Sequence, residues 1–344
     1  MRLLLTGGAG FIGSNLARHL LSQDGYEILV VDKLTYAGQS TTLRTLEGRP
    51  GYQFLQADIA DAPAMAAALA RFQPDAVLNL AAESHVDRSI TGPAPFIHSN
   101  LVGTYTLLDA SLHYYRALNP TRQRAFRFLQ VSTDEVYGDL APGDDAFRES
   151  DPYRPSSPYS ASKAGADHLV RAWHRTFGLP VLIAMGSNNY GPYQHPEKLI
   201  PTVILRAWRQ EAIPIYGDGS QQRDWLYVDD HVTALERILA DGHPGESYHV
   251  GGHCERANLD LARHLCRLMD EFKPRPGGHP YAELIEHVTD RPGHDRRYAM
   301  DFSRLRREFG WEPQHAMEQA LRHTVQWYLE NESWWASMLD PKAE

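Results

Sequence analysis

The strongest constraint on the fold is a glycine-rich turn directly after the first apolar run of the chain. Residues 1–6 are strand-like and lead into 7–13, where glycines recur as G-x-x-G-x-x-G. Glycines there permit a tight turn and close approach of a pyrophosphate to a helix N-terminus. Alone, the motif could equally be an ordinary strand-to-helix turn. The next strand-like run, 28–31, ends in Asp32, whose carboxylate would bind an adenosine ribose and repel a 2′-phosphate, so the pattern predicts NAD rather than NADP.

Strand-like and helix-like runs alternate after this unit. A strand at 52–57, an Ala-rich helix at 63–72 and a strand at 76–80 follow in order, and a long helix is expected from about 100 to 115. This alternation predicts a parallel, doubly wound sheet. We therefore expect an α/β fold: a Rossmann-like doubly wound parallel sheet with a smaller mixed α/β C-terminal substrate-binding domain.

The pattern changes after Lys163, where turn formers gather at 187–193. The expected cofactor domain covers residues 1–185, with 224–250 returning to it, and the expected substrate domain covers 186–223 and 251–344. Arginines beside Gly/Pro turns in this second part suit a diphosphate, although arginines on turns are commonly only solvated.

Catalytic chemistry is indicated by residues 130–138, which contain Asp134 and Glu135, together with 159–163. Tyr159 and Lys163 would lie on one helix face. The ammonium could then lower the pKa of the phenol and leave a base for a sugar hydroxyl. The adjacent acid pair supplies the second acid/base function that elimination of water next to a new ketone requires.

Composition excludes several classes. The formal charge of −9 disfavours non-specific nucleic-acid binding. Cys254 and Cys266 are the only cysteines, which are too few for a disulfide framework and lack zinc-ligand spacing, so we expect free thiols and no metal. No apolar stretch approaches the ~20 residues of a membrane span, and no signal peptide is seen, so we expect a cytoplasmic protein without a membrane partner.

Eight motifs together resemble the extended short-chain dehydrogenase/reductase (nucleotide-sugar epimerase/dehydratase) family, and within it the dTDP-glucose 4,6-dehydratases. The similarity covers nearly the whole chain. The acid pair and the segments 196–201 and 290–298 are its most selective parts. The motifs are residues 6–13, 81–87, 132–138, 158–163, 187–193, 196–201, 223–228 and 290–298.

The resemblance implies a hydro-lyase that converts dTDP-glucose to dTDP-4-keto-6-deoxyglucose. The sugar is oxidised at C4, water is eliminated across C5–C6, and hydride returns to C6 from an NAD that stays bound. Tyr159 would be the base for the 4-hydroxyl, tuned by Lys163, and Thr133 would contact the same hydroxyl. Glu135 would take the C5 proton, and Asp134 would protonate the departing C6 hydroxyl. The family also implies a homodimer.

Family contacts carried to matching positions give two further sets. The implied cofactor-binding residues are Gly7, Gly10, Phe11, Ile12, Gly13, Asp32, Lys33, Leu34, Thr35, Asp58, Ile59, Leu80, Ala81, Ala82, Ser84, Ser99, Tyr159, Lys163 and Asn189. The implied substrate-binding residues are Ser84, His85, Thr133, Asp134, Glu135, Asn188, Glu197, Lys198, Leu199, Pro214, Tyr216, Arg223, Asn258, Asp290, Arg291, Pro292, His294 and Tyr298. On the residues alone, Asp58 could instead be a helix N-cap, and Lys33 could be merely solvated.

Two departures from the family pattern lie beside the substrate loops. Met185 and Gly186 stand where a Cys commonly precedes Ser-Asn-Asn, and Gln194 and His195 replace a His-Phe pair. They bear on the choice of nucleotide or sugar more than on the reaction. The alternatives are a UDP-sugar 4-epimerase or decarboxylase, a 4,6-dehydratase for another nucleoside-diphosphate hexose, and a catalytically silent NAD-binding scaffold.

Overall fold

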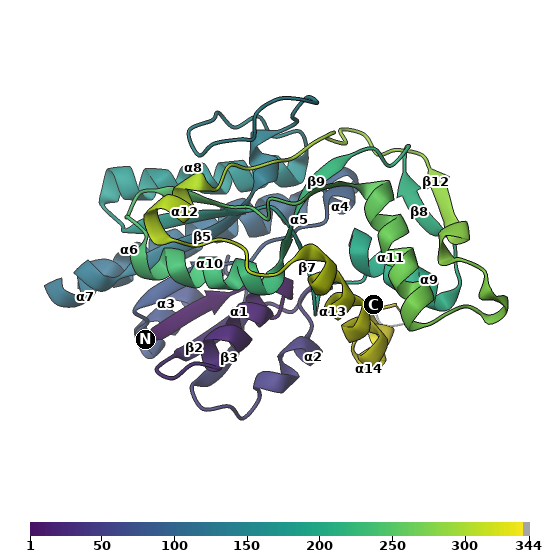
Figure 1. Ribbon diagram of the computed structural model, residues 1–344. Helices are drawn as coiled ribbons and strands as arrows, with labels where there is room; N and C mark the ends of the chain where they lie inside the picture. Colours follow the sequence, from purple (N-terminus) through teal and green to yellow (C-terminus); the bar gives the residue numbers. More distant parts are fainter. Residues whose placement is uncertain (340–344) are drawn as a thin grey trace.

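The computed structural model describes residues 1–339, and its centre is a seven-stranded parallel sheet (Figure 1). The strand order is β10-β6-β5-β4-β1-β2-β3, so the chain runs outward from β1 to one edge and then returns to build the other side. The reversal lies between β1 and β4, which is where open α/β sheets bind ligands. The strands are β1 (Arg2–Thr6), β2 (Glu27–Asp32), β3 (Tyr52–Gln56), β4 (Ala76–Asn79), β5 (Arg127–Thr133), β6 (Val181–Gly186) and β10 (Ser247–Val250).

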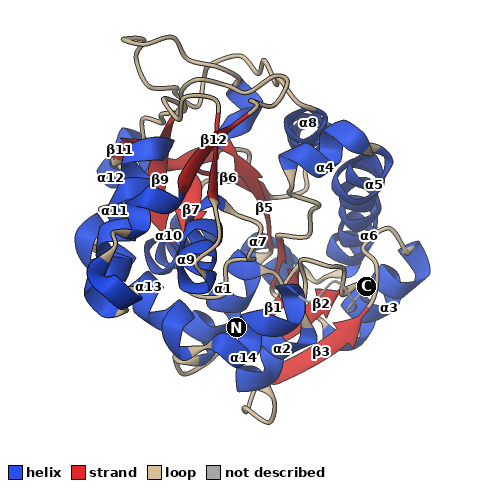
Figure 2. Ribbon diagram, turned by 90° about the vertical axis from the view of Figure 1, so that its right-hand side faces the viewer, coloured by secondary structure: helices blue, strands red, loops and turns tan. Residues whose placement is uncertain are grey.

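Helices cover both faces of this sheet (Figure 2). Alternate residues of a strand point to opposite faces, so Leu3 and Leu5 join one hydrophobic cluster and Leu4 joins the other. Helices α1 and α10 pack together on the first face, and α3, α6 and α8 pack on the second. Their bounds are α1 (Phe11–Leu21), α3 (Ala62–Phe72), α6 (Thr104–Ala117), α8 (Pro158–Phe177) and α10 (Val228–Asp241).

A smaller mixed α/β part follows the main sheet and lies at the right of Figure 1. It contains a three-stranded sheet, β11-β9-β7, and a parallel pair, β12-β8. Its strands are β7 (Asn188–Tyr190), β8 (Ile213–Tyr216), β9 (Gln222–Tyr227), β11 (Glu255–Ala257) and β12 (Ile285–Val288). Its helices are α9 (Leu199–Arg209), α11 (Asn258–Phe272), α13 (Met317–Glu330) and α14 (Glu332–Trp335), whereas α12 (Ser303–Phe309) packs against β10 at the edge of the main sheet.

Short helical turns complete the description. They are α2 (Ser40–Leu43), η1 (Arg44–Leu46), α4 (Val86–Thr91), α5 (Ala94–Phe96), η2 (Ile97–Gly103), α7 (Pro120–Ala125), η3 (Asp134–Tyr137), η4 (Pro276–Gly278), η5 (Tyr281–Leu284) and η6 (Ala336–Leu339).

The predicted fold class is confirmed, with one difference in the long central helix. The helix expected from about residue 100 is regular only from Thr104, because a π-helical segment, η2, precedes it. Gly103 ends that segment where a Cβ would lie 2.6 Å from Ile59 Cγ1, so the close packing there demands glycine.

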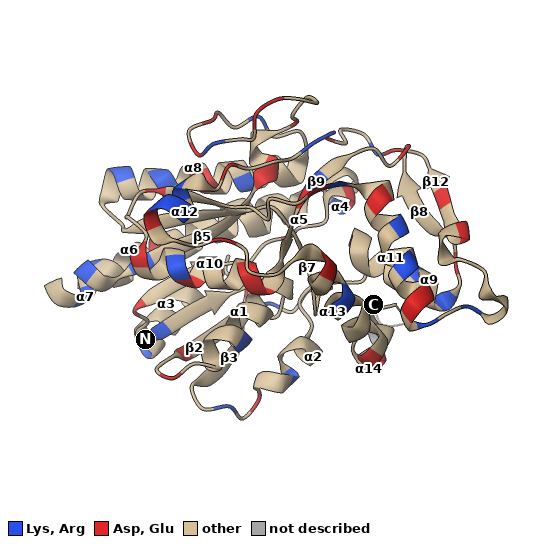
Figure 3. Cartoon of the chain, in the orientation of Figure 1, with Lys and Arg blue, Asp and Glu red and all other residues tan. Residues whose placement is uncertain are grey.

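Charged residues of both signs are interspersed along the outer helices of both parts (Figure 3). Among the residues described, no helix is both long and apolar enough to cross a membrane.

Candidate active site

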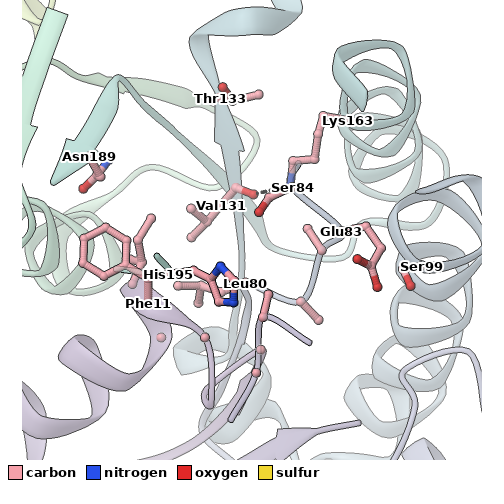
Figure 4. A pocket seen from close by; sticks show the side chains of 18 of the residues that line it. Phe11, Leu80, Glu83, Ser84, Ser99, Val131, Thr133, Lys163, Asn189 and His195 are labelled. Carbon is pink, nitrogen blue, oxygen red and sulfur yellow. Dashed lines mark hydrogen bonds between the residues drawn. The ribbon is translucent and has the colours of Figure 1, made fainter. Parts of the chain in front are cut away.

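A pocket opens at the carboxyl ends of the central strands (Figure 4). Its lining comes from at least four separate elements, which contribute Phe11, Val131, Lys163 and Asn189. The glycine-rich turn forms one wall, the end of β5 forms another, and the loops after β4 and β6 complete it. The pocket therefore lies at the reversal of strand order, as expected for this architecture.

The glycine-rich turn is held by close backbone packing. Gly7 has φ +69°, and a Cβ on it would lie 2.6 Å from the backbone nitrogen of Ala81. A Cβ on Gly13 would lie 2.3 Å from the carbonyl oxygen of Gly7. Both positions require glycine, and the turn exposes the start of α1 to the pocket, where an anion would meet the positive end of the helix dipole.

Asp32 joins the end of β2 to this turn. Its Oδ2 accepts a hydrogen bond from Ala9 N at 2.9 Å and its Oδ1 accepts one from Leu34 N at 2.9 Å. Burial raises the pKa of the carboxyl, while these backbone donors oppose the shift. A Cβ on Gly38 would lie 2.8 Å from Asp32 Oδ1, so a glycine is also needed opposite the carboxylate.

Lys33 belongs to a polar cluster in the pocket. Its Nζ donates to Ser99 Oγ at 2.5 Å and lies 3.7 Å from both Asp58 Oδ2 and Glu83 Oε1. The view of Lys33 as a merely solvated residue is therefore wrong. Asp58 is not the cap of α3 either, because Asp61 occupies that position and accepts from Ala64 N.

The catalytic candidates come together where β5 meets α8. Thr133 ends β5, and its Oγ1 donates to Asp134 Oδ1 at 3.2 Å and accepts from Glu135 N at 3.3 Å. Tyr159 and Lys163 extend from the first two turns of α8, and Lys163 Nζ donates to the Val131 carbonyl at 2.7 Å (Figure 4). All five catalytic candidates line the same pocket.

The two carboxyls of the acid pair differ in their surroundings. Burial raises the pKa of Asp134 well above its ordinary value, and the neighbouring Glu135 adds to the shift. Burial also raises the pKa of Glu135, but Arg291, Arg223 and Lys198 oppose it. Two acids with proton affinities set apart in this way suit a proton donor and a proton acceptor.

The expected lowering of the Tyr159 pKa by Lys163 is not seen. Burial raises the pKa of Tyr159 well above its ordinary value, and the negative charges of Glu135 and Asp134 raise it further. The Lys163 ammonium is itself buried, which lowers its pKa, and it donates to Val131 O. Desolvation therefore outweighs attraction in this arrangement.

Contacts beside the catalytic residues link the loop after β4 to the smaller part of the molecule. Lys198 Nζ donates to Ser84 O at 2.9 Å, and Glu197 Oε2 lies 3.5 Å from His85 Nε2. Burial, with help from Lys198, lowers the pKa of His85 to about 4. Arg291 Nη1 donates to Asp87 Oδ1 at 3.2 Å.

Arg223 is held deeply in the smaller part. Its Nη2 donates to the Asp295 carbonyl at 2.8 Å, and its guanidinium lies 4.4 Å from the centre of the Tyr298 ring. His294 pairs with Asp290, with Nδ1 to Oδ1 at 2.6 Å. These contacts order the segment 290–298 around Arg223.

The pocket contains every expected cofactor residue except Leu34. Of the expected substrate residues, seven line it: Ser84, Thr133, Asp134, Glu135, Asn188, Glu197 and Lys198. The others are not brought to its lining: His85, Leu199, Pro214, Tyr216, Arg223, Asn258, Asp290, Arg291, Pro292, His294 and Tyr298.

Twelve lining residues were not predicted. Several are small residues, and Gly186, Gln194 and His195 stood out in the sequence as departures from the family pattern. His231 gave no recognisable signal, because it reaches the pocket from α10. The set is Val31, Ala37, Gly38, Ala57, Glu83, Val131, Ser132, Gly186, Ser187, Gln194, His195 and His231.

Comparison with known proteins gives consistent relatives over almost the whole chain. The family model described as GDP-mannose 4,6 dehydratase matches residues 4–324. A dTDP-glucose 4,6-dehydratase of Shigella flexneri is 54% identical over 342 residues, covering 97% of this chain and 94% of the relative. One of Xanthomonas campestris pv. campestris (strain B100) is 54% identical over 337 residues, covering 98% and 95%.

Solved structures agree. A dTDP-glucose 4,6-dehydratase of Streptomyces venezuelae, with NAD and TYD bound, has TM-score 0.89 at 42% identity and covers 98% of this chain and 100% of its own. A UDP-glucose 4-epimerase of Thermotoga maritima, with UDP-glucose, has TM-score 0.83 at 28% identity and covers 96% and 99%. Since epimerases share the fold at lower identity, the sequence relatives decide between the two groups, and the chain belongs to the dTDP-glucose 4,6-dehydratase family.

Proposed function

We propose that the protein converts dTDP-glucose to dTDP-4-keto-6-deoxyglucose. The observation that carries this proposal is the acid pair, with Asp134 buried and Glu135 partly exposed, in one pocket with Tyr159 and Lys163. A pair of carboxyls with different proton affinities supports elimination of water, which an epimerase does not perform. The family relatives, including a structure with NAD and TYD bound, support the same reaction.

NAD is the cofactor that this pocket fits. The close packing at Gly7 and Gly13 leaves backbone where a pyrophosphate would lie, and Asp32 ends β2 at the ribose position. A relative of Bacillus anthracis, at TM-score 0.87 and 40% identity, was solved in complex with NAD. When bound, NAD would take hydride from C4 of the sugar and return it to C6.

The chain's own residues would move the protons. Tyr159, as its phenolate, takes the proton of the 4-hydroxyl, with Thr133 holding the same oxygen and Lys163 providing positive charge behind it. The positive charge of NAD, when bound, would oppose the burial that raises the Tyr159 pKa. Glu135 then removes the C5 proton, which the new ketone has acidified. Asp134, the carboxyl with the higher proton affinity, protonates the C6 hydroxyl as it leaves.

The smaller part of the molecule would hold the nucleotide. We assign the NAD-binding role to residues 1–185 with 224–250, and the sugar-nucleotide role to 186–223 with 251–344. Arg223 and His294 would be nearest the diphosphate. The positive charges of Arg223, Arg291 and Lys198 act on Glu135 from this part, which supports a site for an anionic ligand there.

A homodimer through α6 and α8 fits the exposed apolar side chains. Ile97, Val102, Tyr105 and Phe177 are 43%, 40%, 48% and 41% exposed, and they come from η2, α6 and α8. Replacing Tyr105 by Glu should turn the dimer into monomers in sedimentation velocity experiments. A wild-type protein that sediments as a monomer would contradict this assignment. We also propose a cytoplasmic location, which the free thiols of Cys254 and Cys266 support.

One assay tests the reaction and the nucleobase together. The purified protein is incubated separately with dTDP-, UDP-, CDP- and GDP-linked glucose, and the products are analysed by mass spectrometry. We expect loss of one water from dTDP-glucose. An epimerase would change the sugar without changing its mass, and a silent scaffold would leave all four unchanged.

A further inference from the structure

His231 is a fully buried histidine that lines the proposed NAD pocket. It lies in the first turn of α10, and its relative exposure is 0%. Helix α10 packs on the sheet face opposite α8, which carries Tyr159 and Lys163. His231 therefore approaches the pocket from the side away from these catalytic candidates.

The hydrogen bonds of Asn189 determine which ring nitrogen of His231 carries hydrogen. Asn189 Nδ2 lies 2.8 Å from the Ser187 carbonyl, which can only accept. Asn189 Oδ1 is therefore the atom that faces His231 Nδ1, at 2.9 Å, and Nδ1 must donate to it. Burial lowers the pKa of His231 to about 4, so the ring is neutral at pH 7 and Nε2 keeps its lone pair.

Nε2 of His231 has no hydrogen-bond partner within residues 1–339. A buried acceptor without a donor destabilises the protein, so a ligand donor at this atom would be favourable. The missing partner is therefore expected to come from what the pocket binds.

Gly186 faces the edge of the ring that carries Nε2. A Cβ on Gly186 would lie 2.8 Å from His231 Cε1 and 3.1 Å from His231 Nε2, and both residues line the pocket. This glycine is one of the departures from the family pattern. A side chain at this position would occupy the space in front of Nε2.

We propose that His231 Nε2 accepts a hydrogen bond from the carboxamide N–H of the nicotinamide, across the space left by Gly186. The inference rests on the proposed function, since it takes NAD as the cofactor. The pyrophosphate of NAD offers only acceptors, and the adenine amino group is expected near Asp58, at the other end. Tyr159 and Lys163 on α8 serve the nicotinamide ribose, which leaves the carboxamide as the donor for the α10 side.

The test compares NAD with 3-acetylpyridine adenine dinucleotide, in which a methyl ketone replaces the carboxamide and no N–H remains. Dissociation constants are measured by calorimetry on the full chain after bound nucleotide has been removed. Wild type should bind NAD about 3- to 10-fold more tightly than the analogue, the range expected for one hydrogen bond. His231→Phe should bind the two dinucleotides equally.

Two further variants test the proposal if His231→Phe folds poorly. Gly186→Ala should also reduce the preference for NAD, because the added methyl group crowds Nε2. His231→Gln retains an acceptor and should restore part of the preference.

His249→Phe is the matched control. His249 is equally buried, and its Nε2 pairs with Tyr137 OH at 2.8 Å, but it does not line the pocket. This variant should keep the wild-type preference. A full preference for NAD in both His231→Phe and Gly186→Ala would overturn the inference. Absence of NAD binding to wild type would instead overturn the proposed function together with it, and turnover of dTDP-glucose without the preference would overturn the inference alone.

Discussion

Asp134 and Glu135 are neighbours in the sequence, yet the fold gives them different proton affinities. Asp134 is only 1% exposed, and its Oδ2 has no partner among the described residues. Arg291, Arg223 and Lys198 all oppose the raised pKa of Glu135, whereas Arg223 is the cation that opposes the raised pKa of Asp134. The stronger upward shift of the Asp134 pKa suits it to the role of proton donor, and the cations around Glu135 suit that carboxyl to the role of proton acceptor.

Asp134→Asn should separate the oxidation from the elimination. The amide keeps the shape of the side chain but cannot protonate the C6 hydroxyl, so oxidation at C4 survives while loss of water slows. Mixing the variant with dTDP-glucose should produce the near-ultraviolet absorbance of reduced nicotinamide, with little product. The exposed Asp145→Asn is the control and should behave as wild type. Full-rate product formation by Asp134→Asn would remove the chemical basis of the dehydratase assignment.

Asp134→Asn should also stabilise the protein relative to wild type, and by more as the pH rises. The folded-state pKa of Asp134 is raised above the unfolded value. Below the unfolded pKa of about 4, the buried carboxyl therefore does not reduce the free energy of unfolding. As the pH rises from the unfolded pKa to the folded pKa, this carboxyl reduces the free energy of unfolding more and more. Urea unfolding should show Asp134→Asn to be more stable than wild type at pH 8, with the difference shrinking toward pH 4. A constant difference across this range would contradict the raised pKa.

Tyr159→Phe should remove the first chemical step. The 4-hydroxyl then has no positioned proton acceptor, and loss of a general base typically costs ~10²- to 10⁴-fold in rate. In this variant no reduced nicotinamide should form with substrate, unlike in Asp134→Asn. Equal rates for Tyr159→Phe and wild type would show that another group takes the proton.

The catalytic candidates could be predicted at this scale because they are close in the sequence. Thr133 to Glu135 and Tyr159 to Lys163 form two short motifs whose spacing already specifies their chemistry. His231 could not be predicted, because its contact with Asn189 spans 42 residues and depends on how α10 packs. The raised pKa of Tyr159 was also beyond sequence reasoning, since burial is a property of the whole fold.

Helix α8 depends on a cap at its first turn. Ser157 Oγ accepts from Ser160 N at 3.1 Å, and Ser160 Oγ accepts from Ser157 N at 3.0 Å. This reciprocal pair satisfies two backbone donors that a helix start leaves free. Because Tyr159 lies inside the capped turn, the cap supports the position of the phenol as well as the helix.

Ser157→Ala should therefore affect both stability and turnover. Loss of the cap is expected to reduce the free energy of unfolding by about 1 kcal/mol, and fraying of the first turn should lower kcat. Asn119→Ala is the matched control, because Asn119 caps α7 through Arg122 N at 3.0 Å and α7 carries no pocket residue. Denaturant unfolding measures the loss of stability in each variant, and steady-state kinetics measure the loss of kcat. An equal loss of stability with unchanged kcat in both variants would show that the cap is only structural.

Element positions were largely predictable because strands and helices alternate with clear apolar patterns. The strands expected at 28–31, 52–57 and 76–80 correspond to β2, β3 and β4. The π-helical segment η2 that precedes Thr104 was not predicted, and Gly103 at its end packs against Ile59. Local sequence specifies which element forms, whereas its first turn depends on what packs against it.

At the scale of the whole molecule, the C-terminal helices brace the pocket from outside. Trp334 Nε1 donates to Thr42 Oγ1 at 3.2 Å, which joins α14 to the N-terminal part of the chain. Tyr328 OH donates to the Gln194 carbonyl, and Gln194 Nε2 donates to Asn189 O at 2.7 Å. The support that these C-terminal aromatics give to a loop of the pocket could not be predicted, because it depends on contacts between residues that are far apart in the sequence.

Trp334→Ala should consequently impair binding as well as stability. Trp334 packs edge-on against Tyr193, with ring centres 5.5 Å apart, and Tyr193 directly precedes Gln194 in the pocket loop. Truncating a buried Trp typically costs about 3–5 kcal/mol, and the loosened loop should raise KM for the nucleotide sugar and weaken NAD binding.

Trp311→Ala is the matched control for this last prediction. Trp311 has the same relative exposure as Trp334, 8%, and its Nε1 donates to a threonine hydroxyl, Thr233 Oγ1, at 3.0 Å. It lines no part of the NAD pocket. Both variants should therefore lose similar unfolding free energy in urea, but only Trp334→Ala should show higher KM and weaker NAD binding. Equal kinetic effects would mean that the C-terminal helices stabilise the fold as a whole without acting on the pocket loop.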